Sequence, residues 1–485
     1  MPIPPDQADT AALLARLSGA APLETHISAV FRGPDTVWKL KKAVRLGFLD
    51  FTRLPDRERF LRRELALNEP HAPGLYRDVV PVTRTPSGLD LDGPGTPVDW
   101  VLRMAPVPPS DFLDERARAG GLDDKLLTDL ADAVAAMHAA QPPVPGHDPV
   151  AALRTVIAGN ARAAKDAGLH PAFIATWRAR IETALAAAAP ALAARAPLVR
   201  RAHGDLHLGN LMLWQGRPVP FDALEFDEDL ATIDPGYDLA FLLMDLERLQ
   251  SRAAANHVLN RYVARTGDAS LVAGLPAFLS LRATVRAHVE AARGNDPAPL
   301  AAAALSVLDS ARPVVLAIGG LMGTGKTTLA RALAPTLGPA PGALVLRTDE
   351  IRKRLHGVAP EDRLPRNLYA PSATARTEDA LLHALSAAAG HAVIADATFT
   401  DPAFRARVEA AARAANLPFL GVWLHAPLPE LERRVAARRD DASDATVSVL
   451  RRAHAATHLP ADWLHIEATD AAAIRENVQT RLTML

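Results

Sequence analysis

The residues best suited to carry out chemistry lie in the stretch "GGLMGTGKTT". Its glycines allow backbone N–H groups to close around phosphate oxygens, and the helix that follows adds positive potential at its N-terminus. Its lysine is placed to reach the β- and γ-phosphates of a nucleotide, and the next hydroxyl can hold Mg²⁺. The stretch lies between an apolar strand and a helix, which is the context that such a loop requires. It predicts a nucleoside triphosphate site made by Gly320, Gly323, Gly325, Lys326, Thr327 and Thr328.

A candidate general base follows in "LRTDEIRKRL". Asp349 stands at the end of a predicted strand, where a carboxylate can lie across a cleft from the γ-phosphate. From there it can accept the proton of a substrate hydroxyl. The same position also suits the N-cap of the next helix, so a purely structural role for Asp349 remains an alternative.

Two further features concern the phosphates. The strand in "AVIADATF" ends in Asp396 followed by Ala397. Mechanical ATPases of the AAA type usually carry Asp-Glu there, so the general base that such enzymes use for water is missing. Arg434 and Arg438 lie one helical turn apart, from where they can swing over the phosphates as a lid. A solvated basic face is the alternative for this pair.

The segments "TDEIRKRL", "VIADATF" and "RVAAR" followed by "DASDA" resemble the small P-loop kinases near gluconate kinase, polynucleotide kinase and the zeta-type toxins. The resemblance covers about residues 312–485. It implies a general base at Asp349, a substrate or phosphate contact at Arg352, a metal-organising acid at Asp396, and lid arginines at Arg434 and Arg438. The residue pattern alone also allows Arg352 to be a surface residue of a helix.

A second candidate site lies in "HGDLHLGN". Asp205 and Asn210 have the D-x-x-x-x-N spacing of the protein-kinase catalytic loop, in which the Asp accepts the hydroxyl proton and the Asn binds Mg²⁺. A metal-binding Asp is needed just beyond, at the end of a short hairpin. The strands "LMLW" and "PVPFD" flank the turn "QGR" and place Asp222 there.

The same architecture needs a strand lysine held by a helix glutamate. A hairpin formed by "THISAVFR" and "TVWKLKK" precedes the helix "RERFLRRELALNE". The second strand supplies Lys39, and the helix supplies Glu64. Lys41 is the competitor, because it points to the same face of the strand as Lys39. Lys39 is preferred for its place four residues beyond the turn.

Along the chain the order is hairpin lysine, helix glutamate, "HGDLHLGN" loop and hairpin aspartate. In this order the elements resemble the aminoglycoside phosphotransferase family, whose fold is protein-kinase-like, over about residues 20–300. "MHAAQP" before the loop and "DPGYDLA" after it fit as well. The resemblance implies that His203 braces the loop and that Asp238 ties it to the following helix. It implies catalytic and cofactor roles for Asp205 as base, Asn210 and Asp222 on Mg²⁺, and Lys39, held by Glu64, on the nucleotide phosphates.

Two departures from that family stand out. The first hairpin carries one glycine, Gly33, and so has no glycine-rich cover for a nucleotide. The segment "ALEFDEDL" is more acidic than the short aromatic follow-on that the family usually has. Its carboxylates either bind a cationic substrate or solvate a loop, and they are Glu225, Asp227, Glu228 and Asp229.

The elements that must position these residues predict two domains. Alternating β-prone stretches give way to helices of 3.6-residue period after about residue 105, and strands alternate with helices after residue 313. We predict an α+β, protein-kinase-like two-lobed domain, then an α/β P-loop domain with a parallel sheet. The predicted boundaries are 1–305 for the first domain, with lobes at about 20–105 and 106–300, and 306–485 for the second. The Gly- and Pro-punctuated segment 294–313 is the expected linker.

Composition narrows the class of protein. Of 485 residues, 49% are hydrophobic and 22% charged, and none is cysteine, which excludes disulfides, thiolate zinc sites and cysteine nucleophiles. The formal charge of −1 gives no footprint for long nucleic acid or an anionic membrane. The first residues lack the features of a signal peptide, and no apolar run approaches the ~20 residues of a membrane span. We expect a cytoplasmic protein without a membrane partner, and the sequence leaves its oligomeric state open.

The leading functional hypothesis is a tandem kinase. Each domain would use ATP and Mg²⁺ to move the γ-phosphate to a hydroxyl of a small molecule, with Asp205 and Asp349 as the two bases. The alternative keeps only the P-loop half active, possibly on a 5′-hydroxyl of nucleic acid, with the N-terminal domain as a ligand-sensing regulator. Neither acceptor is identified by the sequence.

Overall fold

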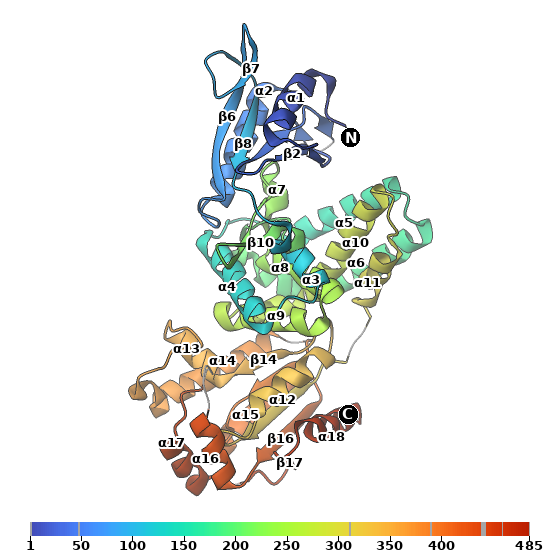
Figure 1. The fold of residues 1–485 in the computed structure, drawn as a ribbon. Coiled ribbons are helices and arrows are strands. Elements are labelled where there is room, and N and C mark those ends of the chain that lie inside the picture. The colour runs from blue at the N-terminus through green and yellow to red at the C-terminus, as the bar shows by residue number, and fades with distance from the viewer. Residues whose placement is uncertain are drawn as a thin grey trace. The chain divides into compact units, whose positions relative to one another are not determined.

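The computed structural model describes residues 2–46, 49–309, 312–388, 390–437, 443–457 and 459–484 (Figure 1). The chain divides into two compact units. One is Met1–Pro145 with Leu198–Asp238, and the other is Gly146–Pro197 with Leu239–Leu485.

The first unit contains a six-stranded antiparallel sheet in the order β1-β2-β3-β8-β6-β7. The predicted hairpin is its centre: Val30 of β2 pairs with Lys39 of β3. The neighbouring strand β8 pairs Lys39 with Leu102, so Lys39 lies on an inner strand. The strands are β1 (Leu23–Glu24), β2 (Ser28–Arg32), β3 (Val37–Lys41), β6 (Tyr76–Thr85), β7 (Gly88–Leu91) and β8 (Thr96–Met104), and a separate small hairpin joins β4 (Arg45–Leu46) to β5 (Leu49–Asp50).

Helix α2 (Leu54–Asn68) is the helix predicted to hold the lysine. It begins with a proline in its first turn, where the missing N–H has no partner to lose. Leu61 packs with Tyr76 and Leu102 in one apolar cluster, which fixes the face of α2 that meets the sheet. Glu64 is one turn farther along and is fully buried, so it points at the same sheet.

The rest of the first unit positions the second candidate site. The hairpin β10–β11 follows the "HGDLHLGN" loop, as predicted, and pairs Met212 with Val219. The remaining elements are α1 (Ala8–Ser18), α3 (Leu113–Arg118), α4 (Asp124–Ala140), β9 (Arg200–Arg201), β10 (Leu211–Trp214), β11 (Arg217–Pro220), α7 (Glu228–Ala231) and β12 (Thr232–Ile233).

The second unit joins a set of helices to the C-terminal sheet. Helix α8 (Pro235–Leu249) begins in the first unit and continues into the second. The predicted linker 294–313 contains a helix, α11, because its run of alanines and leucines favours a helix. This helix packs against α10. The helices of this set are α5 (Pro149–Asp166), α6 (Pro171–Ala194), α9 (Arg252–Thr266), α10 (Leu275–Ala292) and α11 (Ala298–Ser306).

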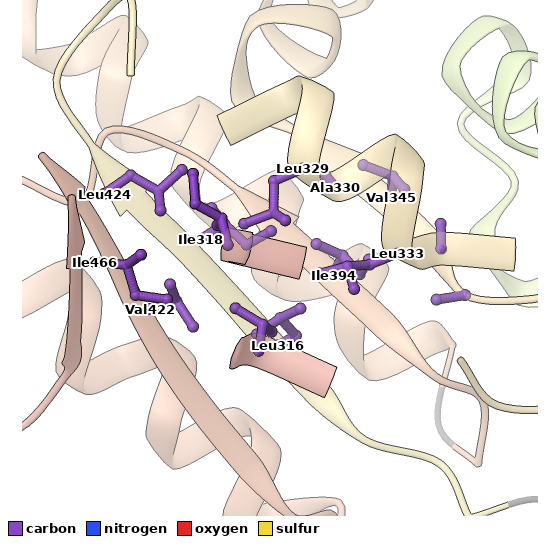
Figure 2. Packing of buried hydrophobic residues seen from close by; sticks show 14 of the residues in the cluster. Leu316, Ile318, Leu329, Ala330, Leu333, Val345, Ile394, Val422, Leu424 and Ile466 are labelled. Atoms are coloured by element: carbon purple, nitrogen blue, oxygen red, sulfur yellow. The ribbon is translucent and has the colours of Figure 1, made fainter. Parts of the chain in front are cut away.

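The C-terminal sheet has five parallel strands in the order β14-β15-β13-β16-β17, which confirms the predicted α/β fold. Alternate residues of the central strand, Leu316 and Ile318, pack with Leu329 and Leu333 of α12 (Figure 2). This core fixes α12 against the strand that precedes it. The elements are β13 (Val315–Gly320), α12 (Lys326–Leu333), β14 (Leu344–Arg347), α13 (Thr348–Leu355), α14 (Pro371–Ala387), β15 (Val393–Asp396), α15 (Pro402–Ala414), β16 (Phe419–His425), α16 (Leu428–Ala437), α17 (Val447–Ala456), β17 (Leu464–Glu467) and α18 (Ala471–Thr483).

None of the helices in the described ranges combines the length and the apolar character that crossing a bilayer needs.

Candidate active sites

The predicted phosphate-binding loop joins β13 to α12. Gly320 has φ of 137°, and a Cβ there would lie 2.3 Å from the carbonyl oxygen of Leu424, so only glycine fits. The Thr327 hydroxyl donates to Asp396 Oδ2 over 2.6 Å, and Lys326 Nζ lies 3.0 Å from the Leu321 carbonyl. The loop therefore brings its hydroxyl and the acid at the end of β15 to one point.

A cavity of about 1170 Å³ opens above this loop. It is lined by the phosphate-binding loop and also by Asp349 and Arg352. Asp349 lies in the first turn of α13, whose N-cap position is taken by Arg347. The alternative in which Asp349 is the helix N-cap is therefore wrong. The cavity contains all the P-loop site residues that the structure describes, namely Gly323, Gly325, Lys326, Thr327, Thr328, Asp349, Arg352, Asp396 and Arg434, with Gly320 at the end of the adjoining strand.

Arg352 is buried with 7% of its surface exposed, so the surface alternative is wrong for this residue. Its Nη1 donates to the Leu368 carbonyl over 3.1 Å, and its guanidinium lies 4.8 Å from the centre of the Tyr369 ring. The Nε atom has no hydrogen-bond partner among the described residues. A buried cation that lines a cavity and keeps an unpartnered N–H is suited to bind an anion.

The predicted lid arginines have separate outcomes. Arg434 lies on α16 and donates to the carbonyl oxygens of Ala468 (3.0 Å) and, at the limit of a hydrogen bond, Gly323 (3.4 Å). It therefore reaches the phosphate-binding loop, unlike Arg433, whose side chain is 70% exposed. Arg438 lies outside the residues that the structure describes.

The loop of the first unit holds Asp205 beside Asn210. Asn210 Nδ2 donates to the main-chain oxygen of Asp205 (3.0 Å) and to its Oδ2 (3.1 Å). The Asp205 side chain is 43% exposed, so an acceptor hydroxyl has access to it. His207 Nε2 lies 3.5 Å from the same carboxylate. The five-residue spacing thus places both polar groups at one point.

His203 and Asp238 hold this loop in place. The Asp238 carboxylate accepts the backbone N–H groups of His203 (3.0 Å) and Gly204 (2.9 Å), and His138 Nε2 lies 3.0 Å from it. His203 Nε2 donates to the carbonyl of Phe221 over 2.9 Å. Burial lowers the pKa of His203 below its usual value although Asp238 and Asp205 oppose this, so a neutral brace is favoured.

Lys39 contacts Glu64, the partner predicted for it, and also Asp222, which was predicted as a metal ligand. Its Nζ lies 2.7 Å from Glu64 Oε1 and 2.5 Å from Asp222 Oδ1. Burial alone would lower the pKa of Lys39, but the carboxylates of Asp222 and Glu64 outweigh it and raise the pKa well above its usual value. Burial would likewise raise the pKa of Asp222, but the charge of Lys39 outweighs it and the pKa is lowered. The lysine therefore lies charged between two carboxylates.

Lys41 is part of the same cluster. Its Nζ lies 3.0 Å from Glu64 Oε2 and 2.5 Å from Glu225 Oε1. Glu225 is 4% exposed, so the solvated-loop reading is wrong for this residue. Burial raises the pKa of Glu225 above its usual value against the opposing charge of Lys41. Both lysines thus share Glu64, and the one nearer Asp222 is Lys39.

The backbone around Asp222 is held by the N-terminal part of the unit. Its N–H donates to the Tyr76 hydroxyl over 2.9 Å, and the next N–H, of Ala223, donates to Asn68 Oδ1 over 3.0 Å. Asp222 has φ of 59°, a left-handed conformation in which Asp and Asn are tolerated better than most residues. A local backbone outlier of this kind is common at functional sites.

Comparison with known proteins agrees with both halves of this geometry. A family model described as "Phosphotransferase enzyme family" matches residues 77–278, and one described as "AAA domain" matches residues 315–460. The protein Rv2004c of Mycobacterium tuberculosis and Mb2027c of Mycobacterium bovis, both described as uncharacterized, are each 30% identical over 492 residues. The match covers 93% of this chain and 92% of theirs. The chain belongs to the Rv2004c family.

Solved structures resemble the two halves of this Rv2004c-family chain separately. A choline/ethanolamine kinase family protein from Mesorhizobium loti is 13% identical with a TM-score of 0.40, over 62% of this chain and 93% of that one. The APS kinase of Mycobacterium tuberculosis is 21% identical with a TM-score of 0.27, over 36% and 99%. A gluconokinase from Sinorhizobium meliloti is 17% identical with a TM-score of 0.24, over 35% and 97%.

The family models confirm the predicted fusion of an aminoglycoside phosphotransferase-like domain with a P-loop domain. The Rv2004c-family chain is therefore a phosphotransferase enzyme. We call the part matched at 77–278 the phosphotransferase domain and the part matched at 315–460 the P-loop domain.

Both domains offer oxygen donors that suit Mg²⁺. The ion favours one or two protein oxygens together with phosphate oxygens, and it binds few all-protein cages. In the phosphotransferase domain, Asp222 and Asn210 are the candidate ligands, and the Asn210 amide turns its nitrogen to Asp205. In the P-loop domain, the Thr327 hydroxyl and Asp396 meet directly. Among the described residues there is no group of three acidic, His or Cys side chains that could hold a metal ion.

Several cavity residues of the Rv2004c-family chain escape prediction from sequence. Asp444 Oδ2 accepts the Tyr369 hydroxyl (2.6 Å) and the N–H of Leu364 (2.9 Å), which joins the segment after α16 to the segment before α14. Arg452 also lines the cavity. Asp444 lies in the segment "DASDA", which carries the resemblance but assigns it no role, and Arg452 lies in no quoted motif.

Proposed function

We propose that the protein is a tandem ATP-dependent kinase of the cytoplasm. Each domain moves the γ-phosphate of ATP to a hydroxyl of a small molecule, with Asp349 as general base in the P-loop domain and Asp205 in the phosphotransferase domain. The observation that carries the proposal is the single cavity that unites the phosphate-binding loop, the Thr327–Asp396 pair and Asp349.

Phosphoryl transfer to an alcohol needs three things from the protein. The phosphates must be held, the negative charge that builds up on them must be balanced, and the acceptor hydroxyl must lose its proton. Lys326 and the loop N–H groups serve the first two, and Mg²⁺, if held by Thr327 and Asp396, would neutralise phosphate charge. Asp349, which lines the same cavity, takes the proton of the attacking hydroxyl.

The described cavity also favours transfer over plain hydrolysis. Asp396 is followed by Ala397, so no second carboxylate stands beside it to orient a water molecule. The same cavity is also lined by Asp349 and the buried Arg352, next to which an acceptor would lie. A mechanochemical ATPase has no need of such a pair.

Arg352 limits the chemistry of the acceptor. Its guanidinium is buried and its Nε has no hydrogen-bond partner among the described residues, so an anionic group on the acceptor would gain a charge-assisted hydrogen bond there. The acceptor of the P-loop domain is therefore proposed to be a small molecule with a hydroxyl and a carboxylate, phosphate or sulfate group.

In the phosphotransferase domain the same tasks fall to other residues. Lys39, oriented by Glu64, lies within reach of nucleotide phosphates, and Asp222 and Asn210 offer oxygen ligands for the metal. Asp205 is half exposed and takes the proton of the acceptor hydroxyl.

The test uses the full chain with labelled ATP and a panel of acceptors: sugar acids, sugar phosphates, nucleotides, neutral sugars, aminoglycosides and oligonucleotides. Asp349→Asn should abolish transfer to one class of acceptor and Asp205→Asn transfer to another. Asp129→Asn, an exposed acid on α4, is the matched control. If both variants transfer phosphate like the parent protein, the assignment of the bases is wrong.

The panel also separates the alternative functions. If Asp205→Asn changes no transfer but changes how ATP or a ligand alters the P-loop activity, the phosphotransferase domain is a regulator. If oligonucleotides are the acceptors of the Asp349-dependent activity, with binding that falls steeply with salt, the substrate is nucleic acid.

A further inference from the structure

The parallel sheet of the P-loop domain has an open edge at β14. Leu344 N–H donates to Ala392 on the β15 side, so the next N–H, of Val345, and the carbonyl of Ala343 point away from the sheet. Backbone groups at such an edge need partners when they are buried, and both residues are buried.

Helix α9, which lies inside the phosphotransferase match, supplies these partners. Val345 N–H donates to Asn260 Oδ1 over 2.6 Å, and Asn260 Nδ2 lies 3.2 Å from the Ala343 oxygen. One side-chain amide therefore meets a donor and an acceptor two residues apart, as the peptide groups of a neighbouring strand would. Asn256, one turn earlier and 3% exposed, donates to the same Ala343 oxygen over 3.0 Å.

The contact extends to both sides of the strand. Before β14, Arg252 Nη2 donates to the Gly338 carbonyl over 2.9 Å. After β14, Arg354 of α13 donates to the Ala264 carbonyl over 3.3 Å, and Arg261 forms an ion pair with Glu361 at 2.6 Å. Helix α9, β14 and α13 all belong to the second compact unit.

The consequence concerns the part of the cavity that is lined by Asp349 and Arg352, which we call the acceptor wall. Strand β14 ends at Arg347 and continues without a break into α13, which carries Asp349 and Arg352. The position of this wall therefore depends on the edge strand, whereas the phosphate-binding loop follows β13, which is separated from that edge by β15.

We propose that α9 completes the P-loop sheet at its open edge and that Asn260 is a positioning residue for the acceptor side of the P-loop site. Helix α9, which lies inside the phosphotransferase match, thus supports the site of the P-loop domain. The role of Asp349 in this inference rests on the proposed function, but the pairing of α9 with β14 does not.

Hydrogen–deuterium exchange of the full chain tests the pairing. Asn260→Leu keeps the number and branching of the side-chain heavy atoms and removes both polar atoms. Exchange of the amides of β14 and α13 should become about fivefold faster, the factor expected for one lost hydrogen bond, while β13 and α12 keep their protection. Asn260→Asp retains the oxygen that accepts the Val345 N–H and should restore protection at that amide, and this variant also decides the test if Asn260→Leu fails to fold.

The matched control is Asn160→Leu. Asn160 is also largely buried on a helix of the second unit, but it contacts Val156 and His288 rather than the sheet. Unchanged exchange at β14 in Asn260→Leu, or the same increase in Asn160→Leu, overturns the proposal.

Steady-state kinetics test the positioning role. Asn260→Leu should lower kcat of the Asp349-dependent transfer about fivefold or more and leave the KM for ATP within about twofold, because the phosphate-binding loop does not depend on the edge. An equal loss in nucleotide affinity would show a merely structural role and overturn the positioning part. If the parent chain shows no Asp349-dependent transfer, the proposed function fails, and the exchange experiment still decides whether α9 closes the sheet.

Discussion

Lys41 and Glu64 form an ion pair in which neither side chain is exposed to solvent, with Nζ 3.0 Å from Oε2. The other oxygen of the same carboxylate binds Lys39. Sequence reasoning treated the two lysines as competitors for one position, whereas the structure uses both. Lys39 binds Asp222, and Lys41 joins the sheet to Glu225.

Lys41→Met should destabilise the protein more than Lys39→Met. Loss of Lys41 leaves Glu225 and one oxygen of Glu64 buried without a cation, and breaking such a pair costs about 3 kcal/mol of unfolding free energy. Loss of Lys39 leaves Lys41 on Glu64, and Asp222 is 40% exposed. Urea unfolding measures the difference, and Asp205-dependent transfer should fall more in Lys39→Met. Equal losses of stability would contradict the division of roles.

Asp222→Asn and Asp222→Ala should separate chemistry from backbone conformation. Both remove the carboxylate proposed to bind Mg²⁺, so both should lose Asp205-dependent transfer. Only the alanine is strained at φ of 59°, at a cost of about 1 kcal/mol, because Asn is tolerated in the left-handed region. Thermal unfolding and transfer assays on the two variants test this. A stable Asp222→Ala protein would show that the backbone is not held there.

Arg352→Leu should abolish transfer to the anionic acceptor without lowering stability. The guanidinium is buried with an unpartnered Nε, so leucine removes the cost of burying that charge, which offsets the lost contacts with Leu368 and Tyr369. We expect an unfolding free energy equal to that of the parent or higher by about 1 kcal/mol. Arg352→Lys keeps the charge but loses the planar fork, and should raise the acceptor KM about tenfold or more with the KM for ATP unchanged. A marked loss of stability in Arg352→Leu would argue for a structural arginine.

His391 should make the second unit less stable in acid. Burial lowers its pKa from 6.5 to about 4. Between these values the unfolded chain binds a proton that the folded chain does not, so stability is complete above pH 6.5 and is lost as the pH falls towards 4. The loss is about 3 kcal/mol at most.

The control for this prediction is His391→Gln, which can still donate to the Gly342 carbonyl, the partner of His391 Nε2 at 3.0 Å. The other histidines titrate alike in both proteins, so the difference between their pH profiles belongs to His391. Parallel profiles would contradict the prediction.

The two contiguous motifs could be predicted because their spacing is itself the structure. Asp205 and Asn210 meet within one short loop, and Thr327 meets the acid at the end of the neighbouring strand. Glu225 could not be placed, because its partner Lys41 is 184 residues away and an acidic stretch usually solvates a loop.

Polar residues on helices pose the same difficulty. Asn260 reads as part of the polar face of an amphipathic helix, and nothing in its neighbourhood indicates that it completes a sheet. Arg352 was assigned a substrate role by resemblance, but its burial and its unpartnered Nε depend on segments brought together by the fold.

The side-chain amides of Asn256 and Asn260 on α9 also cover an edge strand on which a second copy of the chain could aggregate. A bare edge strand is a template on which a second copy can add its own strand, and edge-to-edge growth of this kind leads to aggregation. A fragment that begins where the AAA model begins, at residue 315, would lack Asn256 and Asn260 and would offer β14 to any such neighbour. The boundary that is natural in a comparison of sequences is thus a poor place to cut this protein.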